Sequence, residues 1–238
     1  MNYFSEGFIW LNDPLNWTNP GGLLDRLVEH LVISFWAVLL ACAIGWPIGI
    51  WLGHRGRGGG AVVTVANLTL AIPTLALLTI LPLTPLGFGK LPVVVALAVF
   101  AVPPLLANAY TGIRQIDPET RDAARGMGLS GGQLLRRVEL PLAVPYLAAG
   151  LRTAAVQVVA TAALASFVNG GGLGEIISAG FGIGMSNGGG GQIVAGGIVV
   201  ALLALLVEAL LAAFQWAVTP RPLRAVRRSR VAAAVPAG

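Results

Sequence analysis

The stretch "DPETRDAARGMGLSGGQLLRRVELPLAVP", residues 117–145, is the most polar long run in a chain of 238 residues that is 56% hydrophobic and only 11% charged. In an ordinary soluble domain roughly a quarter of the residues are charged. The mean hydropathy of +0.80 also indicates that most of the chain lies in a lipid bilayer. We therefore expect the quoted stretch to be a loop that leaves the membrane between two apolar segments.

Five apolar runs approach or exceed the roughly 20 residues that a helix needs to cross the hydrocarbon core of a bilayer. They cover residues 31–52, 61–83, 91–113, 146–168 and 193–217. The second and third runs contain prolines, which helices in a bundle tolerate because neighbouring helices satisfy the freed backbone groups. We predict an all-α membrane protein with five transmembrane helices, whose transmembrane domain occupies residues 31–217.

The first 30 residues differ from a cleavable signal peptide, because acidic residues stand where such a peptide has a basic region and an apolar core. These are Glu6, Asp13, Asp25 and Glu29. Trp10 and Trp17 suit the boundary between lipid headgroups and water. We expect residues 1–30 to form an extracytoplasmic, interfacial segment.

Lys and Arg are distributed unevenly between the two sets of loops that five spans create. One set holds Arg26 and Lys90, and Arg152 falls within the fourth apolar run. The other set holds twelve: Arg55, Arg57, Arg114, Arg121, Arg125, Arg136, Arg137, Arg221, Arg224, Arg227, Arg228 and Arg230. Because Lys and Arg are retained in cytoplasmic loops, we predict an external amino terminus and a basic cytoplasmic tail at 218–238. This topology explains the net charge of +5, so the expected partner is a lipid membrane and no nucleic acid.

The loop at 114–145 carries start and stop signals for two short helices. Asp117 is a good N-cap and Pro118 a good first helical residue. Gly126 or Gly128 should end this first helix, and Ser130 can cap a second one. The sequence thus predicts two short helices joined by a bend.

Two interpretations of this loop remain open from the residues alone. It is either a solvated loop whose arginines fix the topology, or a rigid knob with the small residues Ala123 and Ala124 exposed on its first helix. Pro141 and Pro145 are expected to end the second helix before the fourth span. A simple linker has no need of caps and stops in this order, which favours the knob.

One spaced pattern in the loop resembles a known family. Asp122-Ala123-Ala124, three residues, Gly128, nine residues, Val138, one residue and Leu140-Pro141 look like the cytoplasmic "EAA" loop of permease subunits in binding-protein-dependent ABC importers. The departure is Asp122, where glutamate is usual. The resemblance implies a type I (MetI-like) permease fold, in which this loop forms coupling helices held in a groove of an ATP-hydrolysing subunit.

The resemblance extends to four apolar or glycine-rich stretches. "HLVISFWAVLLACAIGWPIGI" (30–50), "LAIPTLALLTILP" (70–82), "GFGKLPVVVALAVFAVPPLLANAYTGI" (87–113) and "NGGGLGEIISAGF" (169–181) look like permeases that import osmoprotectants such as glycine betaine, choline, carnitine or proline betaine. The implied partners are an ATP-binding cassette ATPase, a second permease subunit, identical or related, and an extracytoplasmic substrate-binding protein. The implied location is the plasma membrane of a prokaryote, crossed several times.

The chain lacks the sequence of a nucleotide-binding loop, because Gly89-Lys90 is followed by Leu91 and not by Ser or Thr. ATP and magnesium are therefore expected in the partner ATPase, and this chain is expected to be no enzyme and to hold no cofactor. With Cys42 alone and His30 and His54 near opposite membrane faces, we expect no metal or nucleophile cluster. The glycine-rich run at 170–191 is expected to be a tight extracytoplasmic turn.

Glu208 is the candidate polar site inside the fifth span, where a charge is costly and tends to be functional. It could carry protons in an ion-coupled secondary transporter or channel that works without an ATPase, which is the alternative function. It could equally pair with a helix of a partner subunit. The sequence leaves this choice open.

Overall fold

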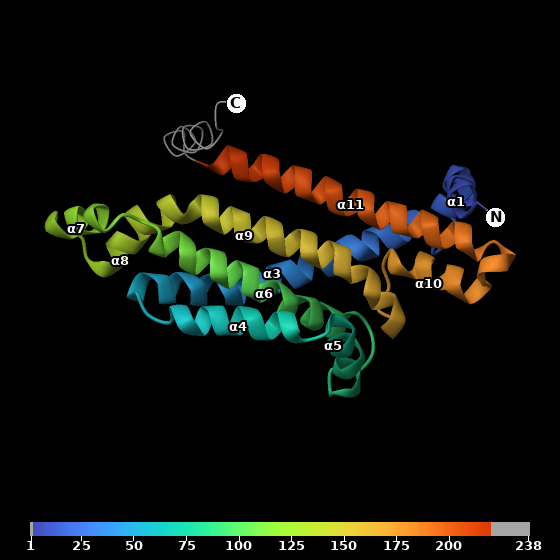
Figure 1. The fold of residues 1–238 in the computed structure, drawn as a ribbon, viewed down its shortest axis with the longest axis horizontal. Helices are drawn as coiled ribbons and strands as arrows, with labels where there is room; N and C mark the ends of the chain where they lie inside the picture. Colours follow the sequence, from blue (N-terminus) through green and yellow to red (C-terminus); the bar gives the residue numbers. More distant parts are fainter. Residues whose placement is uncertain (1, 220–238) are drawn as a thin grey trace, which may run out of the picture.

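The structure is a computed structural model that describes residues 2–219, so the tail arginines of the predicted topology lie outside the described residues. All regular structure in this range is helical. Four helical stretches are long and apolar enough to cross a membrane: Pro14–Arg55, Lys90–Arg114, Gly131–Val168 and Gly189–Val218. They contain the long helices α3 (Leu23–Arg55), α6 (Lys90–Arg114), α9 (Leu140–Thr161) and α11 (Gly189–Val218), which run along the long axis of the molecule (Figure 1).

The predicted second span is broken. Instead of one helix over 61–83, the structure has α4 (Gly59–Ala71), α5 (Thr74–Ile80) and the 3₁₀ turn η1 (Leu81–Leu83). The break lies at Pro73, and Ile72 before it is extended because a residue that precedes proline avoids the helical region. Five unbroken transmembrane helices are therefore not confirmed, and the described residues hold four.

The core of the bundle lies where α3, α6 and α9 meet, and it is lined mainly by small side chains. Its fully buried members include Ala37, Ala41, Ala96, Ala101, Leu105, Ala154 and Val158. Gly45, Gly49 and Gly53 recur every four residues on the side of α3 that faces α6. A Cβ atom at Gly49 would lie 2.5 Å from the carbonyl oxygen of Leu106, so the two backbones approach closely only because glycine is there.

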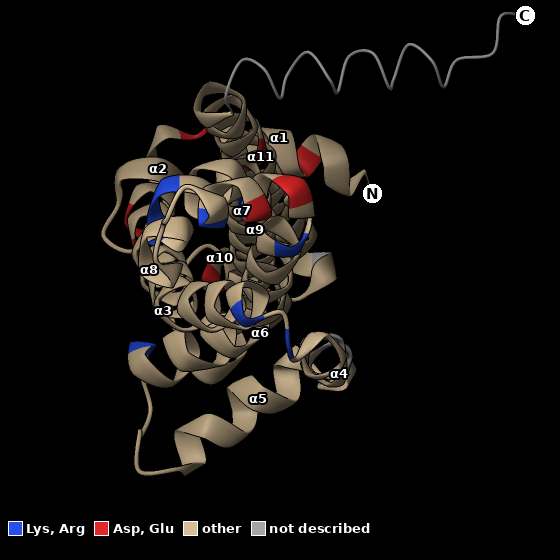
Figure 2. Ribbon diagram, turned by 90° about the vertical axis from the view of Figure 1, so that its left-hand side faces the viewer, with Lys and Arg blue, Asp and Glu red and all other residues tan. Residues whose placement is uncertain are grey.

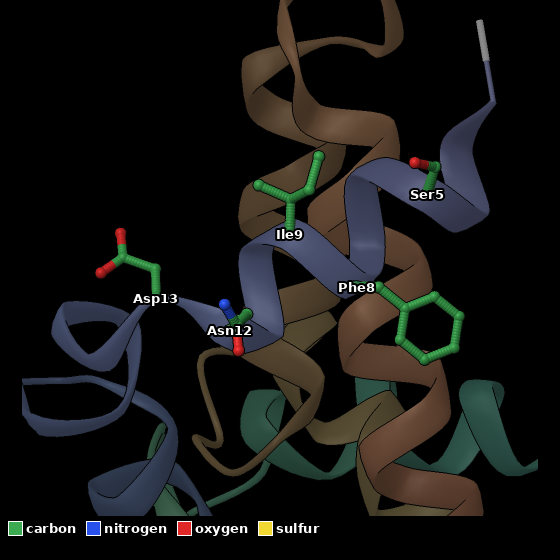
Figure 3. A pocket seen from close by; sticks show the side chains of 5 residues that line it. All are labelled: Ser5, Phe8, Ile9, Asn12 and Asp13. Atoms are coloured by element: carbon green, nitrogen blue, oxygen red, sulfur yellow. The ribbon is translucent and has the colours of Figure 1, made fainter.

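The amino-terminal segment forms α1 (Tyr3–Asn12) and α2 (Pro14–Thr18), and α3 begins at Leu23 rather than at the predicted position 31. Helix α1 crosses α11 (Figures 1 and 3). The crossing is close because Gly190 lies against the ring of Tyr3, and Gly7 lies against Val194. Trp10 is partly buried and packs against the apolar cluster that contains Leu23.

The glycine-rich run does not form a single tight turn, contrary to expectation. After the 3₁₀ segment η3 (Ala162–Val168), it contains α10 (Gly174–Ile183) and the 3₁₀ turn η4 (Met185–Asn187) before α11. A Cβ atom at Gly189 would collide with the carbonyl oxygen of Gly180. The glycines therefore let α10 and α11 pack as a close hairpin.

The predicted loop lies at the opposite end of the molecule from α1 and α10 (Figure 1). It forms α7 (Pro118–Gly126), α8 (Gly131–Leu134) and the π-helical segment η2 (Leu135–Glu139). Figure 2 looks at the molecule from this end and shows Lys and Arg on and around α7 and α8. The turn between α3 and α4 lies at the same end, so loops that are far apart in the sequence meet here.

Candidate functional site

The two short helices of the loop form where their capping residues predict them. The side chain of Asp117 accepts a hydrogen bond from the Glu119 N–H at 2.9 Å, which caps α7. The bend follows at Gly128, whose φ of +84° belongs to the left-handed region that glycine adopts without strain. Ser130 and Gln133 then form a capping box at the start of α8.

The predicted stop at Pro141 and Pro145 is wrong. Helix α8 passes through η2 directly into α9, with Pro141 in the first turn of α9 and Pro145 inside it. In η2 the Leu140 N–H bonds to the carbonyl of Leu135, five residues back. This shift of hydrogen-bond register accommodates the missing N–H of Pro141, so the loop is continuous with a long helix.

The predicted exposed face of α7 needs one correction. Ala123 is exposed, but Ala124 is only 2% exposed and faces the interior of the loop. Met127, which lies one turn after Ala123 on the same face, is 75% exposed. Sequence reasoning missed Met127, although its i, i+4 spacing from Ala123 marks the shared face.

The other predicted loop residues lie on both sides of this face. Asp122 is exposed and pairs with Arg125 at 3.3 Å, a contact between two solvated side chains that contributes little to stability. Val138 and Leu140 are half-buried in η2 and the start of α9, and Pro141 is exposed. The predicted residues thus divide into an outer surface on α7 and a base at the start of α9.

A buried carboxylate that sequence reasoning missed lies beneath the loop. Glu139 in η2 is 1% exposed, and its Oε2 lies 2.5 Å from Nδ1 of His54 in the last turn of α3. Its Oε1 forms an ion pair at 3.2 Å with Nε of Arg121 on α7. Arg121 also donates through Nη2 to the carbonyl of Ile113, in the last turn of α6. One cluster therefore joins α7 to the ends of α3, α6 and α9.

Glu208 has its partner within this chain. It pairs with Arg152 of α9, whose Nε donates to Glu208 Oε1 at 2.7 Å and whose Nη2 also contacts that oxygen. Gln215 accepts from Arg152 at 3.3 Å and donates to the carbonyl of Pro145 at 3.3 Å. These polar groups line a lateral pocket of about 470 Å³ between α9 and α11.

A second charged cluster ties elements together at the opposite end. Glu29 of α3 binds Lys90 at 3.0 Å and Arg26 at 2.9 Å, and it accepts from the Gly172 N–H at 3.2 Å. Arg26 also pairs with Glu175 of α10 at 2.6 Å. The starts of α3, α6 and α10 are thus held together around one carboxylate.

Buried His30 adds to this arrangement. Its Nε2 lies 2.9 Å from the Val159 carbonyl, and its Nδ1 accepts from the Leu173 N–H at 3.3 Å. Because the carbonyl requires a donor and the N–H an acceptor, the ring is a neutral tautomer protonated at Nε2.

Two further hollows lie near α1. A shallow pocket is lined by Ser5, Phe8, Ile9, Asn12 and Asp13 (Figure 3). A cavity of about 280 Å³ lies where α2, the start of α3 and α10 meet. Among the residues that the structure describes, no three potential metal ligands gather at one place.

Comparisons with known proteins cover nearly the whole chain. Residues 45–219 match the family model described as binding-protein-dependent transport system inner membrane component. The chain is 38% identical over 211 residues to the glycine betaine/carnitine/choline transport system permease protein OpuCB of Bacillus subtilis (strain 168), covering 88% of this chain and 94% of that protein. It is 34% identical over 210 residues to the osmoprotectant import permease protein OsmW of Salmonella typhimurium, covering 87% and 96%.

A solved structure has the same architecture. An inward-facing conformation of the MetNI methionine ABC transporter contains a chain that superposes with a TM-score of 0.72 at 25% sequence identity. The match covers 88% of this chain and 100% of that chain.

Proposed function

The chain belongs to the family of inner membrane components of binding-protein-dependent transport systems, and on that premise we propose how it works within an ATP-driven importer. It is the permease subunit of that importer, a multi-pass membrane protein that provides the translocation path. The observation that carries this function is the similarity to osmoprotectant permeases over 88% of the chain. This similarity favours the importer over an ion-coupled carrier or channel.

The transported solute is a quaternary-amine osmoprotectant such as glycine betaine, choline, carnitine or proline betaine. The names of the relatives support this class, since they transport glycine betaine, carnitine or choline. An extracytoplasmic binding protein delivers the solute. A second permease subunit, identical or related, completes the path.

The topology has five crossings, with the amino terminus outside and the carboxyl terminus in the cytoplasm. Supporting this, α4 and α5 together run from the end of the molecule that holds α7 and α8 back to the start of α6 (Figure 1). They serve as one crossing interrupted at Pro73. Seven described arginines of the predicted cytoplasmic set gather at the α7–α8 end, which supports a cytoplasmic position for that end: Arg55, Arg57, Arg114, Arg121, Arg125, Arg136 and Arg137.

The exposed face of α7, formed by Ala123 and Met127, docks in an apolar groove of the ATPase subunit. That subunit, and not this chain, binds ATP and magnesium. A helix that places exposed residues at i and i+4 suits such a groove. Closure of two ATP-loaded ATPase subunits moves the docked loops and opens the path outward, and hydrolysis resets it.

The test is uptake in proteoliposomes that contain the permease, its ATPase and the binding protein, with labelled glycine betaine, choline and carnitine offered separately. We expect uptake of at least one amine that requires both ATP and the binding protein. Uptake that follows an ion gradient and ignores ATP would instead establish the carrier.

A further inference from the structure

The cluster around Glu139 carries an inference about how the loop acts on the membrane helices, and it rests on the proposed function. Glu139 is not among the residues of the loop pattern, yet its side chain is almost completely buried. A buried charge is costly unless other groups compensate it. Here the compensation comes from His54 and Arg121, which belong to two other elements.

We propose that Glu139, with His54 and Arg121, is a positioning cluster that makes the docking loop and the cytoplasmic ends of α3, α6 and α9 move as one rigid body. In this cluster, Glu139 contacts two other elements at once. The two carboxylate oxygens of Glu139 point to different partners, one on α3 and one on α7. Arg121 in turn reaches the carbonyl of Ile113 at the end of α6.

Arg121 suits this role because its guanidinium presents several donors in a fixed planar fork. Its Nε lies 3.2 Å from Glu139 Oε1 as an ion pair without a hydrogen bond, and its Nη2 donates to the Ile113 carbonyl. That carbonyl lies in the last turn of α6 and also accepts a hydrogen bond from the Ile116 N–H at 3.4 Å. A lysine at this position has the same charge, but its three donors rotate about one nitrogen and lack the fixed spacing of the planar fork, so it holds Glu139 and the Ile113 carbonyl less rigidly.

The cluster also links the loop to α3, which is distant in sequence. Besides this cluster, chain connections join α7 to the bundle, and Ala124 and Leu134 are buried within the loop region. Without the cluster, movement of the docked face of α7 would bend the loop and leave α3 in place. With it, the same movement reaches α3 and α6 directly.

The first experiment compares Arg121→Lys and His54→Phe with the wild type in proteoliposomes that contain the whole importer. The probe is an equimolar mixture of labelled glycine betaine, choline and carnitine. We expect both variants to bind the ATPase and hydrolyse ATP normally, because the docking face is unchanged. The amount of amine transported per ATP should fall about tenfold, the scale of losing one hydrogen bond to a charged group.

Two further variants serve as controls. His54→Asn keeps an N–H donor near the position of Nδ1 and should restore most of the transport per ATP. Arg136→Lys makes the same substitution at an exposed arginine in η2 and should leave transport per ATP unchanged. Wild-type transport per ATP in both Arg121→Lys and His54→Phe would overturn the proposal.

A second measurement uses no cluster variant, so it stands even if those variants fold poorly. Spin labels are attached at Arg57→Cys, just after α3, and Glu119→Cys, in the first turn of α7, with Cys42 replaced by alanine. Both labelled positions are exposed. We expect the distance distribution between the labels in the whole importer to stay the same with and without bound ATP.

A distance that changes with ATP would contradict the rigid body. Failure of the proposed function has a different result: the wild-type chain would neither co-purify with the ATPase nor show ATP-dependent uptake.

Discussion

Met127 is a large apolar side chain of the docking loop with 75% exposure, so its substitution separates docking from folding. Met127→Asp places a charge against the apolar groove of the ATPase, where it is poorly solvated. We expect normal abundance in the membrane and an affinity for the ATPase reduced about tenfold, or about 1.4 kcal/mol. Pull-down titration of the ATPase measures this. Met127→Leu keeps the apolar volume and should bind normally, and equal binding by both variants would exclude a docking role.

Ala124 should behave in the opposite way because its side chain faces the loop interior. Ala124→Trp overfills a packed space, which costs about 1–3 kcal/mol. We expect lower abundance or a lower melting temperature, whereas Ala123→Trp on the exposed face should reduce ATPase binding at normal abundance. Immunoblots of membranes together with the pull-down separate the two effects. Normal abundance of Ala124→Trp would show that this residue faces outward.

Glu208 and Arg152 form an internal pair, so their substitutions should be coupled. Arg152→Met leaves the carboxylate of Glu208 without its partner within the membrane, and the double variant Arg152→Met/Glu208→Met removes both charges. We expect the single variant to be less abundant than the double one. Glu208→Gln should retain ATP-dependent uptake with little change in its pH profile. A pH-dependent step lost in Glu208→Gln would indicate that the residue carries protons.

At the scale of elements, the contact between α3 and α6 depends on glycine. Gly49→Ala places a methyl group 2.5 Å from the Leu106 carbonyl oxygen, so the helices must separate, at a cost of about 1–3 kcal/mol. Gly197 is the matched control inside α11, since a Cβ atom there meets nothing within 4 Å. Gly197→Ala should stabilise the protein by about 0.5–1 kcal/mol through helix propensity. In detergent, the melting temperature of Gly49→Ala should therefore fall and that of Gly197→Ala should rise. A shift of both melting temperatures in the same direction would contradict the close packing of α3 and α6.

The elements that sequence predicts well are those whose signals are local. Asp117, Gly128 and Ser130 mark the ends of α7 and α8 through contacts within a few residues. The passage of α8 into α9 across Pro141 was unpredictable, because it depends on the register shift in η2. Glu139 and His54 lie 85 positions apart, so no periodicity reveals their contact. The inward orientation of Ala124 likewise depends on packing within the folded loop.

At the scale of the whole molecule, the topology predicts which positions a probe can reach from outside. In a Cys42→Ala background, a membrane-impermeant maleimide applied to intact cells should label Asn187→Cys, between α10 and α11. It should not label Arg57→Cys, after α3. Both positions are exposed and lie at opposite ends of the bundle. Labelling of Arg57→Cys after the membrane is permeabilised serves as the control, and its labelling in intact cells would overturn the orientation.

The position of Glu139 has a consequence for building chimeric transporters. The docking face and the carboxylate beneath it lie in one continuous segment and the Ile113 carbonyl lies just before it, but His54 comes from a distant part of the chain. A graft of residues 117–141 into another permease therefore transfers the partner preference of the loop without its anchor on α3. Exchanging position 54 together with the graft would supply this anchor, so hybrid importers should be designed around both segments.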